Sequence, residues 1–102
     1  MGIFFALKTN IPKTKLALLD ADCHRLCNHI VNNAMYDYEN EYWSYVDRLN
    51  PLTQKLQTAK HKILQYLIVL ERKGFIYVDL IKMDSDEYDF IILDVRMEYI
   101  MA

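Results

Sequence analysis

The chain has 102 residues, the size of one domain, and we expect a single domain over residues 1–102. Hydrophobic residues make up 53% of it, with only two Gly and two Pro, which is too apolar for a disordered chain. No apolar run approaches the ~20 residues of a membrane span. The net charge of -2 argues against a protein that coats nucleic acid without sequence preference. The two cysteines form no secreted framework, so we expect a cytoplasmic protein without a membrane partner.

The first part of the chain predicts one short strand and one helix. Residues 2–8 are typical of a short strand or of an apolar segment laid over the core, and residues 9–15 form a polar connection. A helix should begin at Asp20, a good N-cap, with Asp22 in a first turn where the helix dipole favours negative charge. One apolar stripe follows at helical spacing: Cys23, Leu26, Cys27, Ile30, Val31 and Ala34.

Aromatic residues dominate the next segment, for which we expect a second helix over residues 38–49. Its buried stripe would hold Tyr38, Tyr42, Tyr45, Val46 and Leu49. Tyr36 and Trp43 fall beside that stripe. Tyr and Trp are common anchors of protein interfaces, so these two residues are candidates for binding a protein partner.

A third, long helix is expected over residues 50–74. Asn50 and Pro51 read as an N-cap followed by Pro at the first helical position, and Gly74 supplies the C-terminal cap. The apolar positions alternate at spacings of four and three: Leu52, Leu56, Ala59, Ile63, Tyr66 and Leu70. Residues 63–70 are apolar nearly all round. Such a segment indicates burial on more than one side or contact with a second protomer, so we expect a homodimer.

An antiparallel hairpin should end the chain, with strands at 75–83 and 90–100 and an acidic turn at 84–89. Its second strand alternates, and one face would hold Ile91, Leu93, Val95, Met97 and Tyr99. Charge separates the two halves of this region. Residues 50–74 hold five basic residues against Glu71, whereas residues 75–102 hold seven acidic residues against Lys82 and Arg96. A basic helix is therefore followed by an acidic hairpin.

The segment at 67–78, Leu-Ile-Val-Leu-Glu-Arg-Lys-Gly-Phe-Ile-Tyr-Val, resembles the junction between recognition helix and wing in winged helix-turn-helix proteins. In that superfamily the helix ends in a Leu-Glu-x-x-Gly-hydrophobic-Ile pattern, and the first wing strand follows without a linker. The resemblance implies an α+β fold: a three-helix winged-helix-like domain with a C-terminal β-hairpin. The chain departs from the superfamily at the tip of the wing, which is acidic. The carboxylates at 84–89 would repel phosphate.

The resemblance implies that the third helix lies in the major groove of duplex DNA. Amide and hydroxyl side chains read base edges, and lysines neutralise phosphate. Seven residues are therefore candidates for DNA binding: Gln54, Lys55, Gln57, Thr58, Lys60, His61 and Lys62. A solvated helix face is the alternative interpretation of the same residues.

No motif indicates a metal, a cofactor or catalysis. Cys23 and Cys27 could in principle share a zinc ion, but both fall on the apolar stripe and should pack as core residues. The acidic turn lacks the Gly and the distal Glu of a calcium loop. The sequence holds no Gly-rich phosphate loop and no triad spacing, so we expect no enzyme.

Two functions remain open. The first is a small DNA-binding regulatory or replication-associated protein. The second is a protein-binding module on the same fold, such as a phage or mobile-element inhibitor of a host protein. That module would use Tyr36 and Trp43 with the hairpin carboxylates Asp84, Asp86 and Glu87.

Overall fold

The computed structural model describes residues 20–82 and 90–101. The expectations for residues 2–8, 9–15 and 84–89 lie outside these ranges. The described part is α+β, as predicted, and combines helices with a four-stranded antiparallel sheet. Its elements in chain order are α2 (Ala21–Asn33), β1 (Met35–Asp37), β2 (Tyr42–Arg48), α3 (Leu49–Leu56), α4 (Lys60–Arg72), β3 (Ile76–Lys82), β4 (Phe90–Val95) and α5 (Met97–Ile100).

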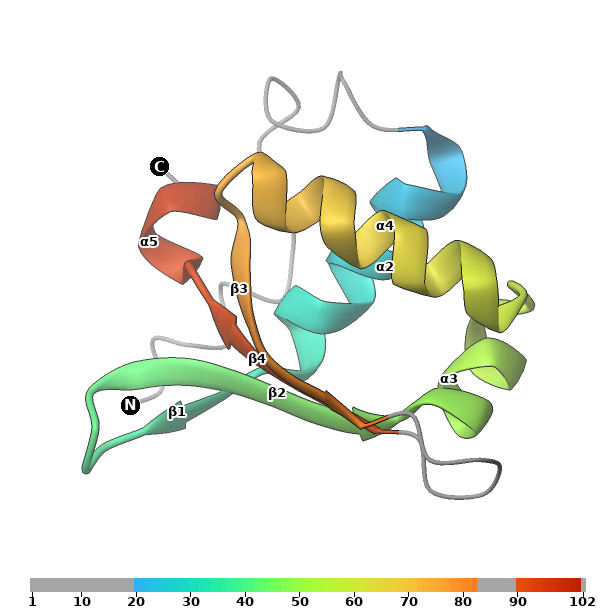
Figure 1. Cartoon of the computed structure of the whole chain (residues 1–102). Coiled ribbons are helices and arrows are strands. Elements are labelled where there is room, and N and C mark those ends of the chain that lie inside the picture. The colour runs from blue at the N-terminus through green and yellow to red at the C-terminus, as the bar shows by residue number, and fades with distance from the viewer. Residues whose placement is uncertain (1–19, 83–89, 102) are drawn as a thin grey trace.

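The sheet has the strand order β1-β2-β4-β3, and every neighbouring pair is antiparallel. Helices α2 and α4 lie over one face of it, and α3 lies near the end where the chain leaves β2 (Figure 1). Tyr45, Leu93 and Val78 share one row of the register across three strands, on the face toward the helices. The core therefore lies between the sheet and α2 and α4.

Helix α2 begins as predicted. The Asp20 carboxylate accepts a hydrogen bond of 2.9 Å from the Cys23 amide, and Asp22 lies in the first turn. Cys23 and Cys27 are both buried in the core, which confirms their predicted packing role. Burial raises the pKa of the Cys23 thiol to about 11 and that of Cys27 to about 12. Both side chains are therefore uncharged core residues at neutral pH.

The prediction of a second helix over residues 38–49 is wrong, because most of this segment is strand β2. Tyr45 is 3% exposed, whereas Tyr38 and Val46 are 66% and 60% exposed, so the expected helical stripe does not form. Aromatic and β-branched side chains favour strands, and here the pairing of β2 with β4 decides the outcome. Asp37 closes the β1–β2 turn by accepting hydrogen bonds from the amides of Glu39 and Asn40.

The single long helix over residues 50–74 is also wrong, because the chain forms α3 and α4 with a break between them. Gln57 adopts a left-handed conformation with φ 53°, and its amide donates to the Gln54 carbonyl. The Thr58 amide donates to the Thr53 carbonyl at 3.1 Å, which completes a Schellman C-cap. Helix α3 also begins at Leu49, before the predicted start. The residues of the expected apolar stripe are buried, except for Ala59, which lies in the break and is exposed.

The junction after α4 forms as predicted. Gly74 has φ 81°, and the Phe75 amide donates to the Leu70 carbonyl at 3.0 Å. The two residues after Gly74 are buried, which confirms the expected turn into the core.

The last predicted strand is too long. Strand β4 ends at Val95, and residues 97–100 form the short helix α5. The alternation holds within the strand, where Ile91, Leu93 and Val95 are buried. Beyond it, Tyr99 is 41% exposed because the helix turns it away from the core face.

Candidate functional site

The seven residues predicted to bind DNA do not share one helix. Gln54 and Lys55 belong to α3, and Gln57 and Thr58 form the connection. The other three, Lys60, His61 and Lys62, are the first residues of α4. The three-residue connection from Gln57 to Ala59 has the length found in helix-turn-helix units. The break thus divides the predicted face into a supporting helix, a turn and a second helix.

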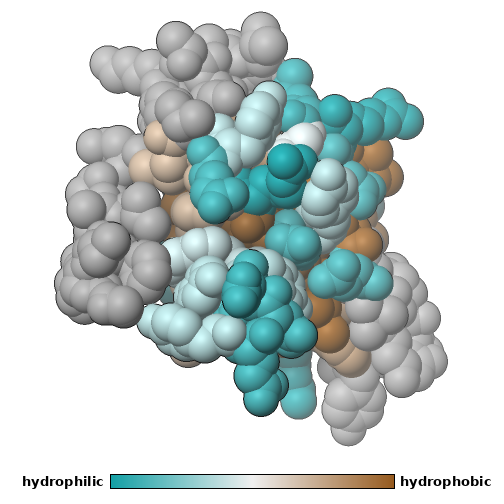
Figure 2. All heavy atoms as spheres, turned by 90° about the vertical axis from the view of Figure 1, so that its left-hand side faces the viewer, coloured by the Kyte–Doolittle hydropathy of each residue, from teal (hydrophilic) through white to brown (hydrophobic). Residues whose placement is uncertain are grey.

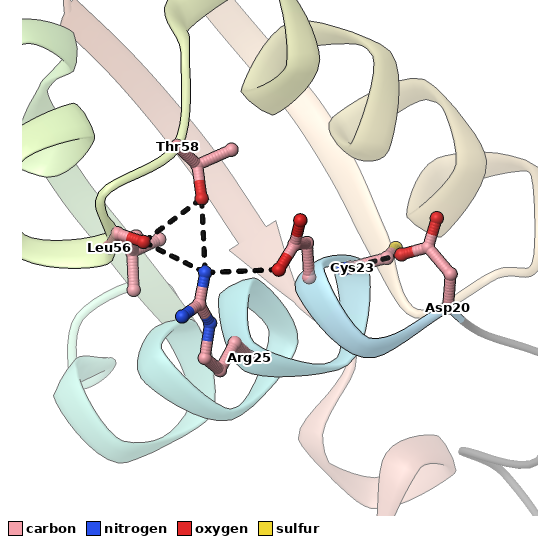
Figure 3. Close-up of polar contacts among 6 residues, drawn as sticks. Asp20, Cys23, Arg25, Leu56 and Thr58 are labelled. Carbon is pink, nitrogen blue, oxygen red and sulfur yellow. Dashed lines mark hydrogen bonds and ion pairs between the residues drawn. The ribbon is translucent and has the colours of Figure 1, made fainter.

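Arg25 fixes the turn from the side of α2 (Figure 3). Its Nη2 donates to the Leu56 carbonyl at 2.8 Å and to the Thr58 hydroxyl at 3.1 Å. The same nitrogen lies 3.1 Å from the Asp22 carboxylate. The Thr58 hydroxyl also donates to the Leu56 carbonyl. Thr58 therefore has a structural role in the turn. The role of Arg25 in the turn is not visible in the sequence, because Leu56 and Thr58 lie more than 30 positions away from it.

Lys55 points toward the sheet rather than along α4. Its Nζ lies 3.7 Å from the Asp47 carboxylate, which also accepts a 2.6 Å hydrogen bond from the Tyr45 hydroxyl. His29 packs edge-on against the Tyr45 ring, with 5.9 Å between centroids. Its pKa is lowered, first by burial and then by the positive charge of Lys55, against an opposing effect of Asp47. Lys55 thus belongs to a polar cluster between α2, β2 and α3.

The beginning of α4 carries charge of an unusual sign. A helix N-terminus has a partial positive charge and favours acidic residues, as α2 shows with Asp20 and Asp22. Helix α4 instead opens with Lys60, His61 and Lys62, has no acidic residue in its first turn, and receives no side-chain hydrogen bond from Ala59 at its N-cap. The positive end of the helix dipole and basic side chains therefore occur in the same turn, a combination that favours anions.

The outer face of α4 changes along its length. Its first half exposes His61, Lys62 and Gln65, and its second half exposes Ile68 and Val69 together with Arg72. The apolar segment at 63–70 is thus buried on one side, and on the other side Ile68 and Val69 are exposed. The homodimer stays a prediction that these exposed apolar residues motivate. Glu71 accepts a 2.9 Å hydrogen bond from the Val78 amide and ties the end of the helix to β3.

The structure describes only some of the residues that were predicted to bind a protein partner. Tyr36 and Trp43 face each other across the β1–β2 pair, with ring centroids 5.4 Å apart and an interplanar angle of 67°. Both line a surface cavity that also includes Tyr77 and Arg96, which sequence reasoning did not connect with them. The hairpin carboxylates Asp84, Asp86 and Glu87 lie outside the described residues.

In the described ranges, no helix is long and apolar enough to cross a membrane. Over the same residues, no three His, Cys, Asp or Glu side chains gather closely enough to hold a metal ion. Comparison of the chain with family models, with curated proteins and with solved structures finds no match in any of the three.

Proposed function

We propose that this chain is a non-enzymatic, winged-helix-like DNA-binding protein with a regulatory or replication-associated role. The order of elements supports it. Helix α2 is followed by the strands β1 and β2, then by the helices α3 and α4, and α4 leads directly into the β3–β4 hairpin. Strand β2 pairs with β4 of that hairpin. The three-residue connection before α4 and the Gly74 junction after it suit a recognition helix held between a turn and a wing.

One observation carries the DNA-binding part of the proposal: α4 begins with two lysines and a histidine at an end that lacks a side-chain cap. In helix-turn-helix proteins, the N-terminal residues of the second helix reach the bases and the neighbouring phosphates. A lysine charge in the first turn of a helix, such as that of Lys62, lies close to the positive helix end, which is unfavourable. A phosphate would turn that cost into attraction, because it meets the backbone amides and the lysines together.

Binding of a fluorescent mixed-sequence duplex, followed by anisotropy over a range of salt concentrations, tests the proposal. The key pair of variants removes one lysine from either end of α4. Lys62→Ala should weaken binding and reduce the slope of log affinity against log salt by about 0.9, the loss of one phosphate contact. Lys73→Ala has the same change in charge and should leave the slope nearly unchanged. No binding at low salt, or equal effects of the two variants, would refute the proposal.

A further inference from the structure

A surface cavity of about 210 Å³ lies away from the start of α4, where the β1–β2 turn meets the end of β4 and α5. Figure 2 looks at the end of the molecule that holds this turn and α5, and hydrophobic atoms show there between pale and hydrophilic residues. Four aromatic residues line the cavity: Tyr36, Tyr42, Trp43 and Tyr77. The sequence contains a single tryptophan, so the only indole of the protein is in this wall.

The rings meet at steep angles. Trp43 and Tyr36 are inclined at 67°, and Tyr38 packs against Tyr36 at 77° with 4.8 Å between centroids. The face of an aromatic ring attracts a cation, and attraction is strongest for the indole of tryptophan.

The remaining polar lining is mainly acidic. Among the described residues of the lining, Glu41, Asp94 and Glu98 contribute three carboxyl groups, and Arg96 contributes a guanidinium. Arg96 is already engaged, because its Cζ lies 5.2 Å from the centre of the Tyr77 ring and its Nη1 donates to the Tyr77 hydroxyl at 3.0 Å. The described part of the lining therefore holds more carboxyl groups than cations. A phosphate or a carboxylate would be repelled here, whereas a cation would be attracted.

The backbone at Glu41 is an independent sign of function. Glu41 has φ 58°, a conformation that L-residues other than Asn and Asp seldom adopt and for which Gly is the usual choice. Its amide donates to the Asp37 carbonyl at 2.7 Å, so the turn holds it in this conformation. Non-glycine residues in strained backbone conformations are common at binding sites, where the function of the side chain compensates for the conformational cost. Here the side chain supplies a carboxylate to the cavity.

We propose that this cavity binds an arginine side chain presented by a partner protein. A planar guanidinium stacks on aromatic rings and forms paired hydrogen bonds with carboxylates, and this lining offers both groups. The inference goes beyond DNA binding and does not depend on it, since α4 begins at the opposite end of the molecule, next to α3 (Figure 1).

Trp43 fluorescence gives a direct test on the intact chain. The probe is N-acetyl-arginine amide, and the matched neutral probe is N-acetyl-citrulline amide, which has the same shape without the charge. The arginine probe should give a saturable change with a dissociation constant on the order of 1–10 mM, because a single side chain supplies only a few favourable contacts. The citrulline probe should give no saturation at the same concentrations. Equal responses to the two probes would overturn the proposal.

Two variants of the same turn separate the cavity from general surface charge. Glu41→Gln keeps the side-chain length and should raise the dissociation constant roughly 5-fold, as expected for the loss of one charged hydrogen bond. Glu39→Gln removes the same charge from an exposed neighbour that does not line the cavity, and should leave the constant nearly unchanged. Urea unfolding of both variants checks that they fold. Equal weakening in two folded variants would show a nonspecific charge effect and overturn the proposal.

Discussion

Replacing Gln57 with glycine should stabilise the protein, although the same replacement three residues earlier should destabilise it. Gln57 has φ 53° and ψ 43° at the C-cap of α3. The left-handed conformation costs an L-residue roughly 1–2 kcal/mol. Glycine avoids this cost but loses about 0.5–1 kcal/mol through its greater freedom in the unfolded chain. The net gain for Gln57→Gly is about 0.5–1 kcal/mol, or roughly 3–6 °C in Tm for a domain of this size.

Gln54→Gly is the matched control. Gln54 is exposed and lies inside α3, so glycine there should lower stability by about 0.5–1 kcal/mol. Thermal unfolding followed by circular dichroism measures both variants. In one continuous helix, both positions would be interior and both replacements would lower Tm by similar amounts. A drop in Tm for Gln57→Gly as large as for Gln54→Gly would therefore refute the break between α3 and α4.

Two further predictions concern α2. Arg25→Met should lower stability by about 1 kcal/mol, because a charged hydrogen bond to the Leu56 carbonyl is lost, although the Thr58 hydroxyl still donates to that carbonyl. Asp22→Asn removes an exposed ion pair and one first-turn charge but leaves the bonds of Arg25 to the turn intact, and should cost less than Arg25→Met in the same urea titration. His29 has a folded-state pKa below its unfolded value, so the unfolded chain takes up the proton first and stability should fall as pH drops below about 6.5. His29→Gln should lose less stability than the wild type between pH 7.5 and 5.5, and an unchanged pH dependence would contradict the assignment.

The elements predicted correctly are those that local chemistry determines. The Asp20 cap needs only its own helix, and the Gly74 junction needs only a residue that tolerates φ 81°. The two wrongly predicted helices have a different cause. At β2, aromatic residues recur at spacings that suit both a helix and a strand, and the pairing with β4 some 50 positions away decides between them. The high β-propensity of Tyr42, Trp43 and Tyr45 and the turn signal at Asp37 could have indicated the strand.

The break at Gln57 was hidden for a related reason. Glutamine is a good helix former, and the apolar spacing runs through Leu56, Ala59 and Ile63 without a change of phase. Alanine is common both in apolar stripes and in turns, so the spacing pattern predicted that Ala59 is buried, whereas it is exposed. The C-cap at Gln57 uses the same motif as the one at Gly74, but without the glycine that marks it.

The candidate site was predictable in part for the same physical reasons. Lys60, His61 and Lys62 are consecutive, so a basic segment was predictable, but only the break before α4 places it at the end of a helix. The roles of Lys55 and Thr58 depend on Asp47 and Arg25, which belong to other elements, and only the tertiary structure reveals those contacts. Pairing of β1 with β2, together with the packing of β3 and α5, brings the cavity residues together, and none of their spacings along the chain indicates it.

The low net charge of -2 does not mean that charge is evenly distributed. The structure places groups of opposite charge at two different ends of the molecule. The start of α4 gathers basic side chains at a positive helix terminus, and the cavity beside α5 gathers carboxylates around aromatic rings. Screening in physiological salt acts over about 8 Å, so two such ends attract different ligands without cancelling each other. A duplex at α4 and an arginine in the cavity would therefore be compatible, and a protein that holds both would link its partner to DNA.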